Sequence, residues 1–187
     1  MSTKVVTGEI RMSYTHLFEP ATPLGGGDAK YEITMLIPKS DTATVEKIRA
    51  AIREARDAYC AKNGAAALPA SPKHPLHDGD GLRDSGEPFG PECKGHWVLK
   101  ARSKSKPAVV DRTRQPILDS SEIYGGCYGR VAFTLFGYNA AGNKGIGALL
   151  LSVQKLKDGP AFGTVGSADD FDDGFLSDGG ADDDFLS

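Results

Sequence analysis

The last 21 residues constrain the fold most, because they cannot belong to a packed core. Residues 167–187 contain eight aspartates and neither lysine nor arginine. A segment with this density of like charge stays solvated and commonly acts as an interaction tail. We therefore expect two parts, a folded domain over residues 1–166 and a disordered acidic tail over residues 167–187.

Removing the tail reveals a basic body. Of the chain's 25 acidic residues, 17 lie in residues 1–166, against all 22 lysines and arginines. This excess of positive charge favours a polyanionic partner. No apolar run reaches the roughly 18 residues of a membrane span, and residues 1–6 lack a signal-peptide stretch. We expect a cytosolic protein without membrane contact, and the odd, widely spaced Cys60, Cys93 and Cys127 predict reduced thiols in the core.

Hydrophobic periodicity predicts a mainly β fold with about five strands and one internal helix. Ser40 or Asp41 can cap the helix, which ends at Asn63 and Gly64. Five prolines between residues 65 and 95 predict a long loop insertion. In the first strand, Val6, Ile10, Met12 and Tyr14 share a face, and the last strand is expected to be buried on both faces. The predicted strands cover residues 5–14, 30–37, 96–106, 124–138 and 146–156.

Two predicted strands carry residues suited to nucleic acid. Lys100, Arg102, Lys104 and Lys106 occupy every second position, which places cations about 6.6 Å apart along one face. Such a strip binds a phosphate backbone by releasing counterions, although an edge strand protected by lysines has the same pattern. We treat both interpretations as open.

The second of these strands alternates core residues with rings and a cation. Val131, Phe133 and Leu135 fall on one face. The other face carries three aromatic rings and an arginine, which a base-stacking platform requires. The alternative is that Phe136 and Tyr138 pack beneath the helix or the long loop. The outer face consists of Tyr128, Arg130, Ala132, Thr134, Phe136 and Tyr138.

Two further clusters combine rings with cations. Arg11, Tyr14, His16 and Phe18 end the first strand, where a groove could start. Trp97 faces the core by strict alternation and faces outward if a bulge lies near Gly95.

Motifs for catalysis or metal binding are weak. His74, His77, Cys93 and His96 have a loose zinc-like spacing, with ordinary surface histidines as the alternative. Residues 78–84 resemble a calcium loop, but Leu82 occupies a ligand position. No nucleophile elbow is present. We expect a protein that is not an enzyme and needs no cofactor.

The tail repeats a short motif. DDGFLS at residues 172–177 is followed by DDDFLS at residues 182–187. A phenylalanine among aspartates gives a partner both apolar surface and charge, whereas a plain solubilising tail would not need it.

Several segments resemble a tailed-phage family of single-stranded-DNA-binding proteins, formerly described only as a domain of unknown function. They are RMSYTHLFEP at residues 11–20, HWVLK at 96–100, KSKP at 104–107 and IYGGCY at 123–128. The T7-type single-strand binder is a more remote likeness. The resemblance covers residues 5–160 and implies a five-stranded OB-fold barrel. It also implies a role in phage DNA replication, recombination and repair in the cytoplasm of the infected bacterium.

We accordingly expect single-stranded DNA to lie in a groove with Lys100, Arg102, Lys104, Lys106 and Arg130 on its phosphates. Tyr128, Phe136 and Tyr138 would stack on bases, and Arg11, Tyr14, Phe18 and Trp97 would complete the surface. The tail would compete for this groove and recruit replication or recombination proteins through Asp182, Asp183, Asp184 and Phe185. Two alternatives stay open, an acidic-tailed chaperone or assembly factor for basic proteins, and a metal-dependent nuclease using residues 78–84.

Overall fold

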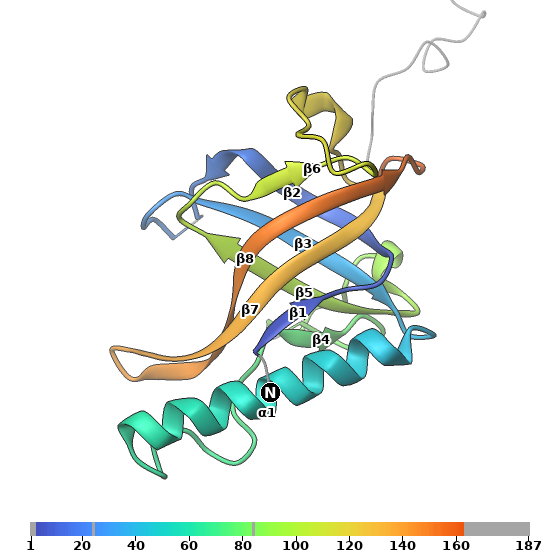
Figure 1. Ribbon diagram of the computed structural model, residues 1–187. Helices are drawn as coiled ribbons and strands as arrows, with labels where there is room; N and C mark the ends of the chain where they lie inside the picture. The colour runs from blue at the N-terminus through green and yellow to red at the C-terminus, as the bar shows by residue number, and fades with distance from the viewer. Residues whose placement is uncertain (1–2, 24, 84, 163–187) are drawn as a thin grey trace, which may run out of the picture.

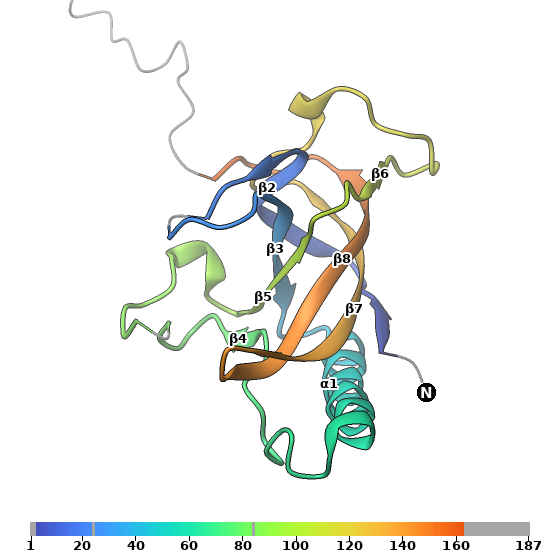
Figure 2. The same ribbon diagram turned by 90° about the vertical axis from the view of Figure 1, so that its left-hand side faces the viewer.

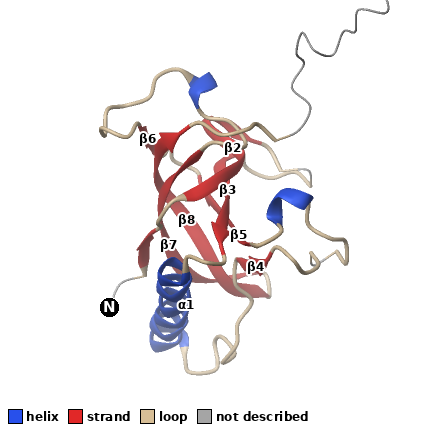
Figure 3. Cartoon of the chain, turned by 90° about the vertical axis from the view of Figure 1, so that its right-hand side faces the viewer, coloured by secondary structure: helices blue, strands red, loops and turns tan. Residues whose placement is uncertain are grey.

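The computed structural model describes residues 3–23, 25–83 and 85–162, which form a sheet-dominated body with one long helix (Figures 1 and 3). The predicted tail and Asp84 lie outside the described residues. The elements are β1 (Lys4–Val6), β2 (Ile10–Ala21), β3 (Lys30–Pro38), α1 (Thr42–Asn63), β4 (Leu76–Asp78), η1 (Pro91–Cys93), β5 (His96–Ser103), β6 (Ala108–Val110), η2 (Ser120–Glu122), β7 (Tyr128–Ala140) and β8 (Asn143–Lys157).

The strand pairings close on themselves. β7 pairs with β2, β2 with β3, β3 with β5, β5 with β8, and β8 pairs back with β7. The pairing of β5 with β8 is parallel, and the other four are antiparallel. Three short strands extend this ring, with β1 on β7, β4 on β5 and β6 on β8.

The prediction of a mainly β fold with one internal helix is confirmed, but the predicted number of strands is wrong. The described residues form eight strands, and β1, β4 and β6 have only three residues each. Three residues are too few for alternation to stand out in a sequence, so tertiary pairing alone defines these strands.

The predicted first strand is split at Thr7. The Thr7 hydroxyl accepts a hydrogen bond from the Val131 amide at 3.1 Å, and the chain resumes as β2 at Ile10. The shared face predicted for Val6, Met12 and Tyr14 is wrong at both ends, because Val6 and Tyr14 are exposed. A bulge in β2 causes the error at Tyr14, whose φ of 45° turns its side chain outward.

The interior of the ring is filled by alternate residues of the long strands. The inward positions predicted for β7 are confirmed, since Val131, Phe133 and Leu135 are at most 2% exposed. The prediction that β8 is buried on both faces is wrong, because Leu149 and Leu151 are exposed. At these positions, no layer formed by the described residues covers its outer face. Cys60, Cys93 and Cys127 are buried free thiols.

Helix α1 lies across one end of the ring (Figures 1 and 2). Asp41 caps it by accepting hydrogen bonds from the Thr44 amide at 3.1 Å and the Thr44 hydroxyl at 2.6 Å. Gly64 ends it with a φ of 109°. The buried face includes Ile48 and Ile52. Both predicted helix ends are therefore confirmed, and the helix covers the end of the core.

We predict that Gly129→Ala destabilises the ring by about 1–3 kcal/mol, the range typical of overpacking. A methyl group at Gly129 would overlap the Gln154 carbonyl oxygen on β8 and the Met12 side chain on β2. The measurement is urea unfolding. Gly25→Ala is the matched control, because nothing lies within 4 Å of its added methyl group. Equal stability of the two variants would show that the strands have room to separate at Gly129.

Candidate nucleic-acid interface

Lys100 and Arg102 lie at the centre of a cationic surface on the outer face of β5. Their neighbours Leu99, Ala101 and Ser103 are buried, so the alternation predicted for this strand is confirmed up to the end of β5. Three adjoining hollows of about 590, 280 and 290 Å³ all include Lys100 and Arg102 in their walls. We call these joined hollows the cationic groove. Its further basic residues are Lys30, Lys73, Arg83 and Lys104.

Two of the predicted rings lie in the largest hollow of the cationic groove. Phe136 and Tyr138 project from the outer face of β7, with ring centroids 6.4 Å apart and planes at 57°. Phe136 is 43% exposed and lies over Gly147, its partner on β8. A methyl group at Gly147 would come within 2.8 Å of the Phe136 ring. The glycine therefore lets the ring lie close to the sheet with one face open.

Glu32 joins the two central cations, and the sequence interpretation did not identify it. Its carboxylate lies 3.3 Å from Arg102 Nε and 3.9 Å from Lys100 Nζ, while its side chain is only 18% exposed. His16 Nε2 lies 4.0 Å away on its other side. Glu32 on β3 is the direct cross-strand partner of Arg102 on β5. An anionic ligand at these two cations therefore meets a negative charge that is already beside them.

Lys104 is also paired inside the groove. Its ammonium group lies 3.0 Å from Asp28, and this hydrogen bond holds the pKa of Asp28 below its ordinary value. Both side chains are well exposed, so solvent screens the pair and its contribution to stability is small. Lys104 is thus free to exchange Asp28 for a phosphate.

Arg11 and Tyr128 lie at the opposite end of β7 from Phe136. Arg11 donates hydrogen bonds to the carbonyl oxygens of Gly126 at 3.1 Å and Pro160 at 2.5 Å. Its guanidinium carbon lies 4.1 Å from the centroid of the Phe162 ring and 5.4 Å from that of Tyr128. These contacts fasten the last described residues to the ring of strands.

The remaining predicted residues are placed outside the hollows of the cationic groove. Arg130 donates to the Thr7 carbonyl oxygen at 3.0 Å. Lys106 lies 5.5 Å from the centroid of the Phe18 ring, beyond the end of β5. Lys39 Nζ and Arg49 Cζ lie 5.3 and 5.0 Å from the centroid of the Trp97 ring. The structure thus brings Tyr14, Lys100, Arg102, Lys104, Phe136 and Tyr138 together and separates them from the rest.

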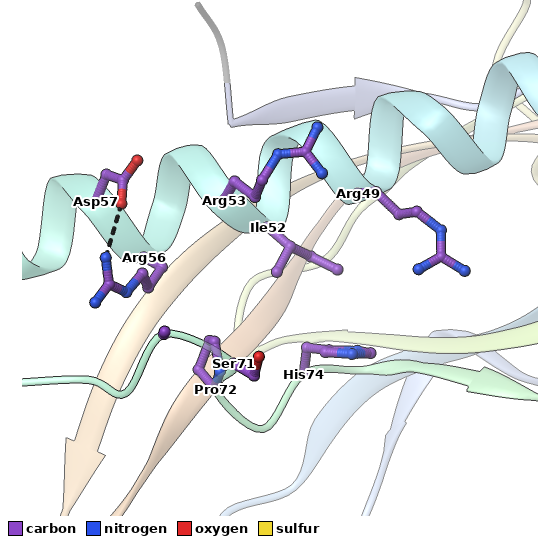
Figure 4. Close-up of a pocket in the computed structure, with 9 residues that line it drawn as sticks. Arg49, Ile52, Arg53, Arg56, Asp57, Ser71, Pro72 and His74 are labelled. Carbon is purple, nitrogen blue, oxygen red and sulfur yellow. Dashed lines mark hydrogen bonds and ion pairs between the residues drawn. The ribbon is translucent and has the colours of Figure 1, made fainter.

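A second basic depression of about 440 Å³ lies between α1 and the segment that precedes β4 (Figure 4). Arg49, Arg53 and Arg56 of α1 line this depression on one side, and Pro72 and His74 line it on the other. The guanidinium of Arg56 is engaged, because it donates to the carbonyl oxygens of Pro69 at 3.0 Å and Leu68 at 3.3 Å. It therefore holds the loop against the helix.

His74 lies where this depression meets the largest hollow of the cationic groove. Burial lowers the pKa of His74, and the neighbouring His77 and Arg49 lower it further. Its Nδ1 accepts a hydrogen bond from the Leu76 amide at 3.3 Å. His74 is therefore neutral at neutral pH and contributes shape rather than charge to the junction.

The candidate metal ligands are engaged in other contacts. Asp78 and Asp80 each lie 2.7 Å from Lys39, whose hydrogen bonds lower the pKa of both carboxyl groups and raise that of the lysine. Cys93 packs in a small apolar cluster with Leu36 and Val98. In the described ranges, no three His, Cys, Asp or Glu side chains gather into a group that could hold a metal ion. No described helix is long and apolar enough to cross a membrane.

A known protein family matches this chain. The profile of the family described as "Enterobacter phage Enc34, ssDNA-binding protein" matches residues 3–186. The chain belongs to this family. A curated relative, "Putative protein p50" of Acyrthosiphon pisum secondary endosymbiont phage 1, is 34% identical over 180 residues, covering 91% of this chain and 93% of its own. The resemblance found in the sequence is therefore confirmed.

Two solved structures are also similar. The single-stranded DNA-binding protein from bacteriophage Enc34 in complex with ssDNA is 33% identical with a TM-score of 0.75, over 86% of this chain and 90% of that one. The bacteriophage T7 single-stranded DNA binding protein gp2.5 is 19% identical with a TM-score of 0.60, over 91% and 93% of the two chains. At that identity the T7 likeness shows the fold alone.

Proposed function

We propose that this protein binds single-stranded DNA along the cationic groove, without requiring a particular sequence. The observation that carries the proposal is that Lys100 and Arg102 share one hollow with Phe136 and Tyr138. Cations neutralise phosphates, and an open ring stacks on any base, so together they suit an unpaired strand. Family membership supports the proposal, since a relative of this family has been solved with ssDNA bound.

The proposal extends to the organisation of the chain. The closed ring of strands is an OB-fold barrel within a domain of residues 1–166, and residues 167–187 form an acidic tail. The protein acts by binding rather than catalysis, in phage DNA replication, recombination and repair in the cytoplasm of the infected bacterium. Tethering gives the tail an effective concentration of roughly millimolar near the groove. DNA that displaces the tail frees Asp182, Asp183, Asp184 and Phe185 to recruit replication or recombination proteins.

Binding is tested with a labelled oligothymidylate of about 30 bases, longer than the roughly 4–16 nucleotides that an OB-fold covers. We expect Lys100→Ala to weaken binding and to reduce the salt slope of log K by about 0.7, because one phosphate contact is lost. Phe136→Ala should cost roughly 1–3 kcal/mol of binding with an unchanged slope, because it removes stacking. Arg112→Ala, outside the groove, is the control. Absence of binding by the unmodified protein at low salt, or equal affinity for duplex, rejects the proposal.

Glu32→Gln should tighten binding to the same oligonucleotide and steepen its salt dependence. The amide keeps the shape of the side chain but releases Lys100 and Arg102 from their internal counter-ion, so phosphate displaces more solution ions. Affinity is measured over a series of salt concentrations. Glu122→Gln on η2 is the matched control and should change neither quantity. A weaker-binding Glu32→Gln protein would show that the carboxylate holds the cations in place for DNA.

Removing residues 167–187 should tighten DNA binding, because the tethered aspartates no longer compete for the cationic groove. The salt slope should change less than in a protein lacking two groove lysines. A full-length variant with asparagine at Asp182, Asp183 and Asp184 controls for chain length and should show part of the gain. Unchanged affinity of the truncated protein refutes competition by the tail.

A further inference from the structure

A side hollow of the cationic groove has the features of a binding pocket of its own. This hollow, of about 290 Å³, branches from the groove at Lys100 and Arg102. It is close to the lower end of the roughly 300–1,000 Å³ typical of small-molecule sites. Tyr14 and Phe89 contribute aromatic rings to its walls. A strand whose phosphates lie on the two cations passes directly beside it.

Tyr14 is held in this wall by a strained backbone. Its φ of 45° is uncommon for a residue other than glycine, and the bulge in β2 between Ser13 and His16 imposes it. The result is a tyrosine that is 59% exposed, beside the buried Ser13. Strain of this kind persists only where the surrounding structure imposes it, and it clusters at ligand sites.

Phe89 contributes the second ring from the long loop before β5. Its centroid lies 6.4 Å from that of His77 on β4, and the guanidinium of Arg83 lies 5.0 Å from it. Phe89 is half-buried and packs against the small apolar cluster that includes Cys93. The loop that the sequence marked only as long and proline-rich therefore places a ring, an imidazole and a cation around one hollow.

Thr34, which lines this hollow, has a buried hydroxyl group that lacks a partner. Thr34 on β3 is only 6% exposed, and its Oγ1 is the buried side-chain polar atom of the described residues that makes no hydrogen bond. A buried hydroxyl without a partner destabilises the folded state, and valine in the same place would avoid this penalty. Its cross-strand neighbours on the same face are Ser13 and Lys100. Position 34 therefore has an unpaired hydroxyl group in the wall of a hollow that aromatic rings also line.

We propose that this hollow receives one nucleobase of the bound strand and that the Thr34 hydroxyl completes its hydrogen bonding with the edge of that base. The inference rests on the proposed function. Lys100, only 3.9 Å from Glu32, turns toward a phosphate when DNA binds and uncovers the hydroxyl beside it. A hydroxyl both donates and accepts, so it pairs with the edge of any base and leaves binding tolerant of sequence.

The test compares Thr34→Val with the unmodified protein on two oligonucleotides of equal length, an oligothymidylate and one with abasic sites throughout. Thr34→Val should bind the oligothymidylate roughly fivefold to tenfold more weakly, with an unchanged salt slope, because no phosphate contact is lost. Both proteins should bind the abasic strand equally. Thr34→Ser, which keeps the hydroxyl, should behave as the unmodified protein.

Two further measurements separate the pocket from a structural role. Thr34→Val should melt at the same or a higher temperature than the unmodified protein, because it removes an unpaired buried hydroxyl. Tyr14→Ala, a change at an exposed ring, should also weaken binding to the oligothymidylate and leave the abasic strand unaffected.

Three outcomes overturn the inference. If Thr34→Val and the unmodified protein bind the oligothymidylate equally, the pocket is rejected and the proposed function is retained. An equal loss on both oligonucleotides places the hydroxyl on the sugar-phosphate backbone instead of a base. Failure of the unmodified protein to bind either strand rejects the proposed function together with the pocket.

Discussion

The pairing of β3 with β5 is the constraint on which the rest of the structure depends. The two strands stay in register from Tyr31 opposite Ser103 to Pro38 opposite His96. This register places Ile33 and Ala101 inside the ring and Glu32 and Arg102 outside it. A shift of one residue would send every side chain to the other face and bury the groove's cations. The same backbone hydrogen bonds therefore maintain both the core and the cationic groove.

Three cations of the groove are paired with carboxylates that a phosphate could replace. Lys100 and Arg102 share the Glu32 carboxylate, and Lys104 pairs with Asp28. Each pair lowers the repulsion between neighbouring cations while the groove is empty, and each is lost when phosphate takes the carboxylate's place. The net gain on binding is the difference between two ionic partners. Under the proposed function, such a difference allows the release of DNA as well as its binding.

Much of the fold was readable from local pattern. Strict alternation in β7 predicted Phe133 inside and Phe136 outside, and Asp41 and Gly64 marked the ends of α1. The turn of Tyr14 to the surface was not readable, because a bulge is set by the partner strand. Likewise, β4 and β6 exist only through pairing with β5 and β8. Glu32 was missed because its importance comes from Arg102 across the sheet.

The sequence by itself determined that the chain has a basic body and an acidic end, that its strands alternate and that cations and rings face outward, because charge and period-two alternation are properties of neighbouring residues. Only the tertiary structure decided which outward residues meet. It placed Phe136 and Lys100 in one hollow. It placed Tyr128, at the other end of β7, beside Arg11 of β2. The reason is that closing the ring brings together residues from distant strands, and this closure depends on all the pairings at once.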